Sequence, residues 1–319
     1  MKPADKKISA TILTPVYNEE SGLEAYRLNV QRFMDENQAY DFEIILVDDG
    51  SNDRSWEMIS QLARADRRFC GIRLSRNFGA HTALTAGIDH AKGDILMTLA
   101  CDLQDPIEVF HEFLQKWRDG AHIVWGKRRS RLDKGWRVLC SKIFFEAVRR
   151  YAMPRESQFT TGSFFLIDRS IIECVKQFRE QNRITFAIVA WTGFCQATVE
   201  YDRKERISGL SGWSFGRMIK AMYDTFLGFS LAPVRLMTFL GLFLSGVSFL
   251  FLLYTLIAWL QGNPMPGWSS LMAIMTFFFG LLFFMISVIG EYLYRIYSEV
   301  VGRPLYFVSE RVGIDEITV

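Results

Sequence analysis

The stretch FEIILVDDGS, residues 42–51, joins an apolar, β-branched run to a polar turn. Such a run predicts a buried strand, and the Asp-Asp-Gly-Ser sequence predicts the turn that ends it. Comparable runs begin at residues 9, 71, 94 and 122, and a helix-like segment separates each run from the next. This alternation predicts an α/β fold with a mostly parallel sheet that is covered by helices on both faces.

Polar, turn-forming residues collect at the ends of four predicted strands, in residues 15–20, 48–51, 76–79 and 102–105. Ligands of parallel α/β sheets bind beyond the carboxyl ends of the strands, so we expect one crevice there. The chain has no GxGxxG after the first strand and no GxxxxGK[ST], which disfavours dinucleotide and P-loop sites. Asp48 and Asp49 could accept hydrogen bonds from a base or ribose, although Asp-Gly-Ser is also ordinary turn chemistry.

The composition changes abruptly in the last third of the chain. Residues 236–290 contain no Asp, Glu, Lys, Arg or His. A polar segment, residues 261–269, divides this region into two runs of roughly 25 and 22 residues, each long enough to cross about 30 Å of hydrocarbon. We expect two transmembrane helices. Two buried core helices are the alternative, which the lack of a polar stripe disfavours.

Basic residues flank the apolar region but are missing from the loop inside it. Because cytoplasmic flanks are rich in Lys and Arg, both chain ends and the globular part are predicted to lie in the cytosol. The 5 cysteines lack Cys-x-x-Cys or Cys/His spacing and fit reduced thiols of a cytosolic domain. We therefore expect a multi-pass protein of the cytoplasmic (inner) membrane. The flanking residues are Arg217, Lys220, Arg235, Arg295, Arg303 and Arg311.

Five short motifs precede or adjoin the apolar region in a fixed order. They are TPVYNEE (14–20), VDDGS (47–51), RNFG (76–79), DLQDP (102–106) and RISGLSGW (206–213). With the two spans, this order resembles the polyisoprenyl-phosphate glycosyltransferases of glycosyltransferase family 2, such as dolichol-phosphate mannose synthase and, more similar still, bacterial bactoprenol glucosyltransferases. The resemblance covers nearly the whole chain. It implies a GT-A (Rossmann-like) fold, a nucleotide-diphosphate sugar donor, Mg²⁺ or Mn²⁺, and inverting transfer to a membrane-embedded polyprenyl phosphate.

On this resemblance, the expected reaction is metal-dependent transfer of glucose from UDP-glucose to undecaprenyl phosphate at the cytosolic membrane face. Two alternatives stay open, a mannosyltransferase that uses GDP-mannose and a non-catalytic membrane scaffold that keeps the fold. A processive polysaccharide synthase is disfavoured, since the chain lacks a Gln-x-x-Arg-Trp motif and further spans. The implied partners are the nucleotide sugar, the polyprenyl phosphate and the membrane, with no nucleic acid. A homo-oligomer is compatible with the sequence.

We expect four segments. Residues 1–212 form the cytosolic glycosyltransferase domain, and residues 213–235 form an interfacial amphipathic helix and linker, for which packing against the sheet is the alternative. Residues 236–293 hold the two transmembrane helices, and residues 294–319 form a cytosolic tail whose alternation suits a short strand pair. The basic run at residues 127–150 favours phosphates or anionic lipids as partners, or is a solvated helix face.

The resemblance also implies roles for particular residues. Asp102 and Gln104 would bind the metal, and the reaction would depend on Asp102 and Arg206. A surface ion pair of Arg206 with Glu205 or Asp202 is the alternative. Residues implied in donor binding are Pro15, Tyr17, Glu19, Asp48, Asp49, Asn77, Gly79 and Asp102. Residues implied in acceptor binding are Arg128, Arg206, Ser211 and Trp213.

Three positions depart from the family pattern. Ala100 stands where a metal-binding aspartate is common, Ser163 where a catalytic aspartate is common, and Gly212 where a lysine is common. We expect water to replace the ligand missing at position 100, because Mg²⁺ usually takes only one or two protein carboxylates besides substrate phosphates. Position 163 needs no base, because a lipid monophosphate with a second pKa of about 6 is already largely a dianion near neutral pH.

Asp105 is expected to have a structural role. It precedes Pro106, and Glu108 follows three residues later, which is the pattern of an N-cap, a first-turn proline and a capping-box glutamate. On this pattern Asp105 caps the helix predicted over residues 106–117 and takes no part in the chemistry.

Overall fold

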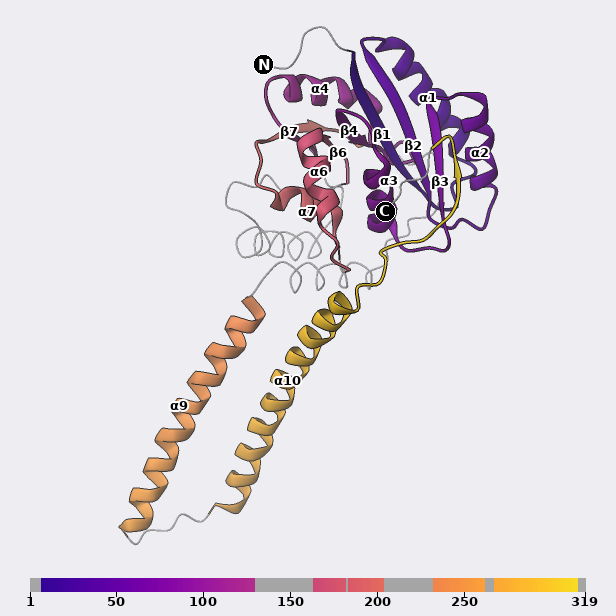
Figure 1. The fold of residues 1–319 in the computed structure, drawn as a ribbon. Helices are drawn as coiled ribbons and strands as arrows, with labels where there is room; N and C mark the ends of the chain where they lie inside the picture. The colour runs from indigo at the N-terminus through magenta and orange to yellow at the C-terminus, as the bar shows by residue number, and fades with distance from the viewer. Residues whose placement is uncertain (1–6, 130–162, 182, 204–231, 262–266, 315–319) are drawn as a thin grey trace. The chain divides into compact units, whose positions relative to one another are not determined.

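The computed structural model describes residues 7–129, 163–181, 183–203, 232–261 and 267–314. The chain divides into two compact units. The first consists of Met1–Met222 together with Pro304–Val319, and the second is Tyr223–Arg303. In Figure 1 the described part of the first unit is an α/β domain, and that of the second holds the long helices labelled α9 and α10.

The α/β unit is built on one eight-stranded sheet in the order β7-β5-β6-β4-β1-β2-β3-β8. β1 pairs in parallel with β2 and β4, β2 pairs with β3, and β5 pairs with β7. β6 lies antiparallel between β4 and β5, and β8 lies antiparallel beside β3. The expected α/β fold with a mostly parallel sheet is confirmed. The strands are β1 Ile8–Val16, β2 Tyr40–Asp48, β3 Phe69–Leu74, β4 Ile95–Thr98, β5 Ile123–Arg128, β6 Phe165–Asp168, β7 Gln196–Tyr201 and β8 Val308–Val312.

Helices cover both faces of this sheet (Figure 1). On one face Ile12 and Ile44 join a buried cluster that takes in residues of α1, α2 and α4. On the other face Leu13 packs against α3, so closely that a Cβ atom on Gly87 would lie 2.0 Å from Leu13 Cδ1. Burial on both faces explains the unbroken apolar run of β2 in the sequence. The helices are α1 Leu23–Glu36, α2 Ser55–Ala65, α3 Ala80–His90, the 3-10 helix η1 Ile107–Val109, α4 Phe110–Arg118, α6 Arg169–Gln177 and α7 Thr185–Trp191.

The end of the chain returns to this sheet. Within the described part of the tail, residues 294–314, there is one strand, β8, and it pairs with β3. The Glu310 position lies opposite Arg73 in this pairing. Alternation in the tail predicted a strand correctly, but it contains no information on a partner so distant in the sequence.

The second unit contains α9 Ala232–Leu260 and α10 Trp268–Val301. Among the described residues, one stretch, Phe277–Val301, is long and apolar enough to cross a membrane, with a mean hydropathy of 1.8. Gly302, with a left-handed φ of 61°, follows the end of α10. The other expected span, which corresponds to α9, stays a prediction. The boundaries of the four expected segments also stay predictions. Most of the expected interfacial helix, residues 213–231, lies outside the described residues.

Candidate active site

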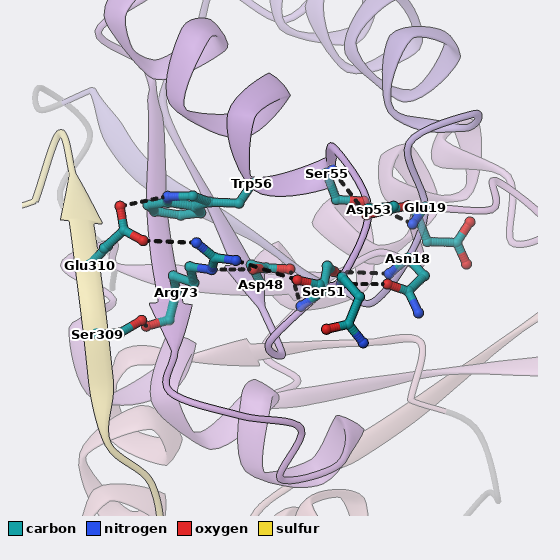
Figure 2. Close-up of polar contacts among 11 residues, drawn as sticks. Asn18, Glu19, Asp48, Ser51, Asp53, Ser55, Trp56, Arg73, Ser309 and Glu310 are labelled. Carbon is teal, nitrogen blue, oxygen red and sulfur yellow. Dashed lines mark hydrogen bonds and ion pairs between the residues drawn. The ribbon is translucent and has the colours of Figure 1, made fainter.

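The loops after β1 and β2 are tied together at the carboxyl edge of the sheet (Figure 2). Asn18 donates its backbone N–H to Ser51 Oγ over 2.9 Å, and its side-chain oxygen accepts the Asn52 N–H over 2.9 Å. Asn18 has a φ of 54°, a left-handed conformation that asparagine adopts more readily than most residues. The neighbouring Tyr17 follows Pro15 by two residues and is 43% exposed, so its ring is accessible to a ligand.

A second set of hydrogen bonds fixes the same loop against the start of α2. Glu19 donates its backbone N–H to Ser55 Oγ over 2.9 Å, and Glu20 donates its N–H to Asp53 Oδ2 over 3.2 Å. Asp53 also accepts the Ser55 N–H over 3.0 Å. The backbone is thus held from both sides, while the Glu19 carboxylate points away from these contacts (Figure 2).

Asp48, at the end of β2, is completely buried. Its Oδ1 accepts the Ser51 N–H over 3.2 Å, and its Oδ2 lies 3.3 Å from Arg73 Nε. Burial raises the pKa of Asp48 above its usual range, and the contacts with Ser51 and Arg73 act in the opposite direction. The carboxylate therefore shapes the turn after β2, and Ser51 and then Arg73 offset part of the cost of its burial.

Asp49 joins the same turn to the loop after β3. Its two oxygens accept the N–H groups of Phe78 over 2.7 Å and Gly79 over 2.9 Å. Burial raises the pKa of Asp49, while these hydrogen bonds lower it. Gly50, which follows the two aspartates, has a φ of +69°, and a Cβ atom there would lie 2.5 Å from the Arg76 carbonyl carbon. Direct contact of either aspartate with a donor stays a prediction; within the protein both hold loops together.

The loop after β3 leads into α3. Gly79 has a φ of +98°, with open space where a side chain would project, and Asn77 beside it is exposed. The Arg76 guanidinium lies 4.4 Å from the centre of the Phe78 ring. The predicted donor residues after β1, β2 and β3 are therefore brought together through backbone contacts between their loops.

Asp102 lies in the loop after β4 and is 8% exposed. Its Oδ1 accepts the Gln104 N–H over 3.2 Å, and Leu103 between them has a left-handed φ of 52°. Ala100, partly exposed in the same loop, contributes only a methyl group. The loop thus offers one carboxylate and one neighbouring amide at the same edge of the sheet.

These groups fit a divalent ion only together with a substrate. The described residues contain no cluster of three or more His, Cys, Asp or Glu side chains that could hold a metal. Mg²⁺ and Mn²⁺ prefer oxygen ligands, and Mg²⁺ commonly binds through one or two carboxylates plus substrate phosphates. Asp102 and Gln104 could supply the few protein ligands that such a site needs, with the substrate phosphates supplying the others.

The predicted capping role of Asp105 is wrong. The 3-10 helix η1 begins after Pro106 without a side-chain cap, and α4 begins at Phe110. Asp105 is buried, and its Oδ1 accepts the Tyr201 hydroxyl over 2.5 Å. The same oxygen lies 3.7 Å from Arg128 Nη2 and 3.8 Å from Arg203 Nε. The Asp105 carboxylate contacts Tyr201 of β7 and two arginines, and it does not cap the helix start. The Asp-Pro-x-Glu pattern therefore gave a wrong prediction here.

Arg128 and Ser163 lie next to strands β5 and β6, which come after β4 in the order of the sheet. Arg128 is the last residue of β5, and Ser163 comes shortly before β6 begins. Arg128, at the end of β5, donates from Nε to the Tyr201 hydroxyl over 3.3 Å. The Ser163 carbonyl accepts the hydroxyl of Thr98, the last residue of β4, and this places Ser163 beside the strand that leads to Asp102. Arg206, Ser211 and Trp213 lie outside the described residues.

Sequence reasoning missed Arg73, Tyr201 and Glu310, which hold the predicted aspartates or their partners in place. Arg73 had a visible signal, because it is a lone cation in the apolar strand FCGIRL. Burial of Tyr201 raises its pKa, as does the neighbouring Asp105, so it remains a hydrogen-bond donor. Tyr201 and Glu310 gave no signal because their partners are remote in the sequence.

The sequence profile of the family described as Glycosyl transferase family 2 matches residues 11–176. An uncharacterised glycosyltransferase of Synechocystis sp. is 35% identical over 310 residues, which cover 97% of each chain. The SfII prophage-derived bactoprenol glucosyl transferase of Shigella flexneri is 34% identical over 302 residues, which cover 94% of this chain and 97% of that protein. The prophage bactoprenol glucosyl transferase homolog of Escherichia coli is 33% identical over 304 residues, which cover 94% and 98%. Coverage of this extent takes in the long helices as well as the α/β unit.

Proposed function

This chain belongs to glycosyltransferase family 2, and we propose from that membership that it transfers glucose from UDP-glucose to undecaprenyl phosphate with inversion at the anomeric carbon. The observation that carries the proposal is the match to the Shigella flexneri bactoprenol glucosyl transferase, which is 34% identical and covers 94% of this chain. A match that includes two long apolar helices favours a lipid acceptor over a soluble one.

The donor would lie over loops that are fixed before it binds. Tyr17 and Asn77, both exposed in these loops, are the described side chains we assign to the nucleotide. Asp48 and Asp49 would act by holding the loops, since their oxygens accept hydrogen bonds within the protein. Loops that are already ordered reduce the entropy lost on binding.

Asp102 and Gln104 would hold Mg²⁺ or Mn²⁺ together with the donor diphosphate. When bound, the ion would balance the charge that develops on the departing diphosphate. Asp102 is suited to this because its carboxylate is fixed by the turn to Gln104. The methyl group of Ala100 leaves that side of the site to water.

The acceptor needs positioning more than activation. Its phosphate oxygen would form a bond to the anomeric carbon as the bond from that carbon to UDP breaks, and UDP would leave with the electron pair. A phosphate dianion has no proton to lose, so Ser163 need not act as a base. We assign the acceptor phosphate to Arg128 and to Arg206, because guanidinium groups bind phosphate bidentately. We assign Ser211 and Trp213 to acceptor binding as well.

The long helices would anchor the enzyme in the membrane. The chain before α9 and the chain after α10 belong to one α/β unit, and β8 pairs with β3 within it. A segment that leaves this unit and returns to it must cross a membrane an even number of times. If Phe277–Val301 crosses, then α9, with 29 residues and a length of about 43 Å, is the other span.

The test is sugar transfer into lipid by the purified full-length protein. Undecaprenyl phosphate, Mn²⁺ and radiolabelled UDP-glucose or GDP-mannose are supplied, and label in the organic phase is counted. We expect transfer from UDP-glucose, with Asp102→Asn lowering kcat/KM at least about tenfold, or about 1.4 kcal/mol of transition-state stabilisation. Glu112→Gln, on the exposed side of α4, is the matched control and should retain activity.

The other outcomes separate the alternatives. Transfer from GDP-mannose alone would replace the donor assignment and keep the acceptor. Absence of label in lipid from either donor would favour the scaffold. Wild-type turnover by Asp102→Asn would remove Asp102 from the site.

A further inference from the structure

The C-terminal strand is attached to the α/β unit along its whole length. The Tyr306 hydroxyl donates to Asp89 Oδ2 over 2.9 Å, and the Phe307 carbonyl accepts the Ser75 N–H over 2.9 Å. Past the strand, the Cys70 thiol donates to the Gly313 carbonyl over 3.1 Å. β8 is thus held at both ends as well as by its pairing with β3.

From this strand Glu310 reaches two side chains of the sheet and of α2 (Figure 2). Its Oε1 accepts a hydrogen bond from Arg73 Nη1 over 2.8 Å, and its Oε2 accepts one from Trp56 Nε1 over 2.9 Å. The Arg73 guanidinium also lies 5.9 Å from the centre of the Trp56 ring. Hydrogen bonds from Arg73 and then Trp56 lower the pKa of Glu310, which is therefore ionised at neutral pH.

Arg73 continues the contacts towards the donor loops. Its Nε lies 3.3 Å from Asp48 Oδ2, and its Nη2 donates to the Ser51 carbonyl over 3.4 Å. Asp48 accepts the Ser51 N–H, and Ser51 Oγ accepts the Asn18 N–H. Figure 2 shows an unbroken series of contacts from Glu310 to the loop after β1.

Glu310 matters because it orients the Arg73 side chain, rather than because its own ion pair stabilises the protein. Its side chain is 52% exposed, and an exposed ion pair by itself contributes little to stability. Asp48 differs, because a buried carboxylate is costly unless it is paired. Arg73 can pair with Asp48 only while the long Arg73 side chain stays in one conformation. The contacts of Arg73 with Glu310 and Trp56 hold it in that conformation.

We propose that Glu310 is a positioning residue for the donor site, acting through Arg73 and Asp48 on the loops after β1 and β2. The proposal rests on the proposed function, which places the nucleotide over these loops. It makes the segment that follows α10 part of the donor-binding machinery. A chain that folds without this contact would keep its sheet and lose affinity for the nucleotide.

The test is donor binding by the full-length protein in detergent, without lipid acceptor. Calorimetric titration with UDP-glucose, and separately with GDP-mannose, each with Mn²⁺, compares wild type, Glu310→Gln, Arg73→Gln and the double variant. We expect Glu310→Gln to raise Kd about fivefold or more, and the double variant to match Arg73→Gln alone, because the first residue acts through the second. Turnover at saturating donor should stay within about twofold for Glu310→Gln, so that the effect appears in KM.

The matched control is Ser309→Ala on the same strand. Ser309 Oγ donates to the Arg73 carbonyl over 3.2 Å and does not touch the guanidinium. It should bind donor like wild type, and the thermal unfolding midpoints of Glu310→Gln and Ser309→Ala should agree. Wild-type affinity in Glu310→Gln, or a further loss when it is added to Arg73→Gln, would overturn the positioning role. If the wild-type protein binds neither UDP-glucose nor GDP-mannose, the proposed function fails, and the inference with it.

Discussion

Asp102 and Asp105 lie three residues apart in one loop and have different surroundings. Asp102 accepts an N–H within its own turn, whereas Asp105 accepts the Tyr201 hydroxyl and faces the guanidinium groups of Arg128 and Arg203. A carboxylate that pairs with arginines fixes where they point. Asp105 is therefore placed to orient Arg128, which we assign to the acceptor phosphate.

We expect Asp105→Ala to destabilise the protein and to weaken acceptor use. The Tyr201 hydroxyl would lose its acceptor, at a cost of about 1–3 kcal/mol, and Arg128 would lose the partner that orients it. Thermal unfolding in detergent measures the first effect, and KM for undecaprenyl phosphate measures the second. Asp119→Ala, exposed at the end of α4, is the control. The assignment fails if Asp105→Ala matches this control in both measurements.

The error over Asp105 shows what residue patterns leave open. The local sequence Asp-Pro-x-Glu is typical of a helix start, but the Asp105 carboxylate accepts a hydrogen bond from Tyr201 on β7 instead. Asp48 and Asp49 were found because paired carboxylates at a strand end are visible in the sequence. Their buried, loop-holding arrangement was not, because it depends on Arg73 and on the backbone of Phe78 and Gly79.

At the scale of elements, α3 packs unusually closely on β1. A Cβ atom on Gly87 would lie 2.0, 2.8 and 2.9 Å from three side-chain atoms of Leu13, which is completely buried. Leu13 has little room to move, because neighbouring strands β2 and β4 lie on either side of it. Glycine at this position therefore sets the distance between helix and sheet.

We expect Gly87→Ala to destabilise the α/β unit by about 1–3 kcal/mol, as overpacking does, although alanine has about 1 kcal/mol better helix propensity than glycine. The measurement is chemical or thermal unfolding followed by circular dichroism. Ala80→Ser, at the exposed start of the same helix, is the control. Unchanged or increased stability in Gly87→Ala would mean that helix and sheet separate at no cost.

Elements with local periodicity were predictable, and elements defined by distant pairing were less so. The strand–helix alternation predicted β1 to β4 and α1 to α4 because each carries its own apolar pattern. The placing of β6 between β4 and β5, and of β8 beside β3, depends on pairing between remote segments. The sequence of β8 predicts a strand but contains no information about which edge it joins.

At the scale of the whole molecule, the chain leaves the α/β unit, forms two long helices and returns. Residues Pro304–Val319 belong to the same unit as Met1–Met222. Strand pairing between β8 and β3 cannot operate across a bilayer, so both lie on one side of it. The charge distribution around residues 236–290 independently predicts that this side is the cytosol.

The loop between the helices should then face the outside of the cell. Asn263 lies in this loop, outside the described residues, and Asn263→Cys should react with a membrane-impermeant maleimide added to intact cells. Cys195, exposed in the α/β unit, is an internal control that should react only after lysis. Labelling of position 263 only after lysis would mean that the helices do not cross or that the orientation is reversed. Labelling of Cys195 in intact cells would decide for the reversed orientation, because the whole α/β unit must share one side.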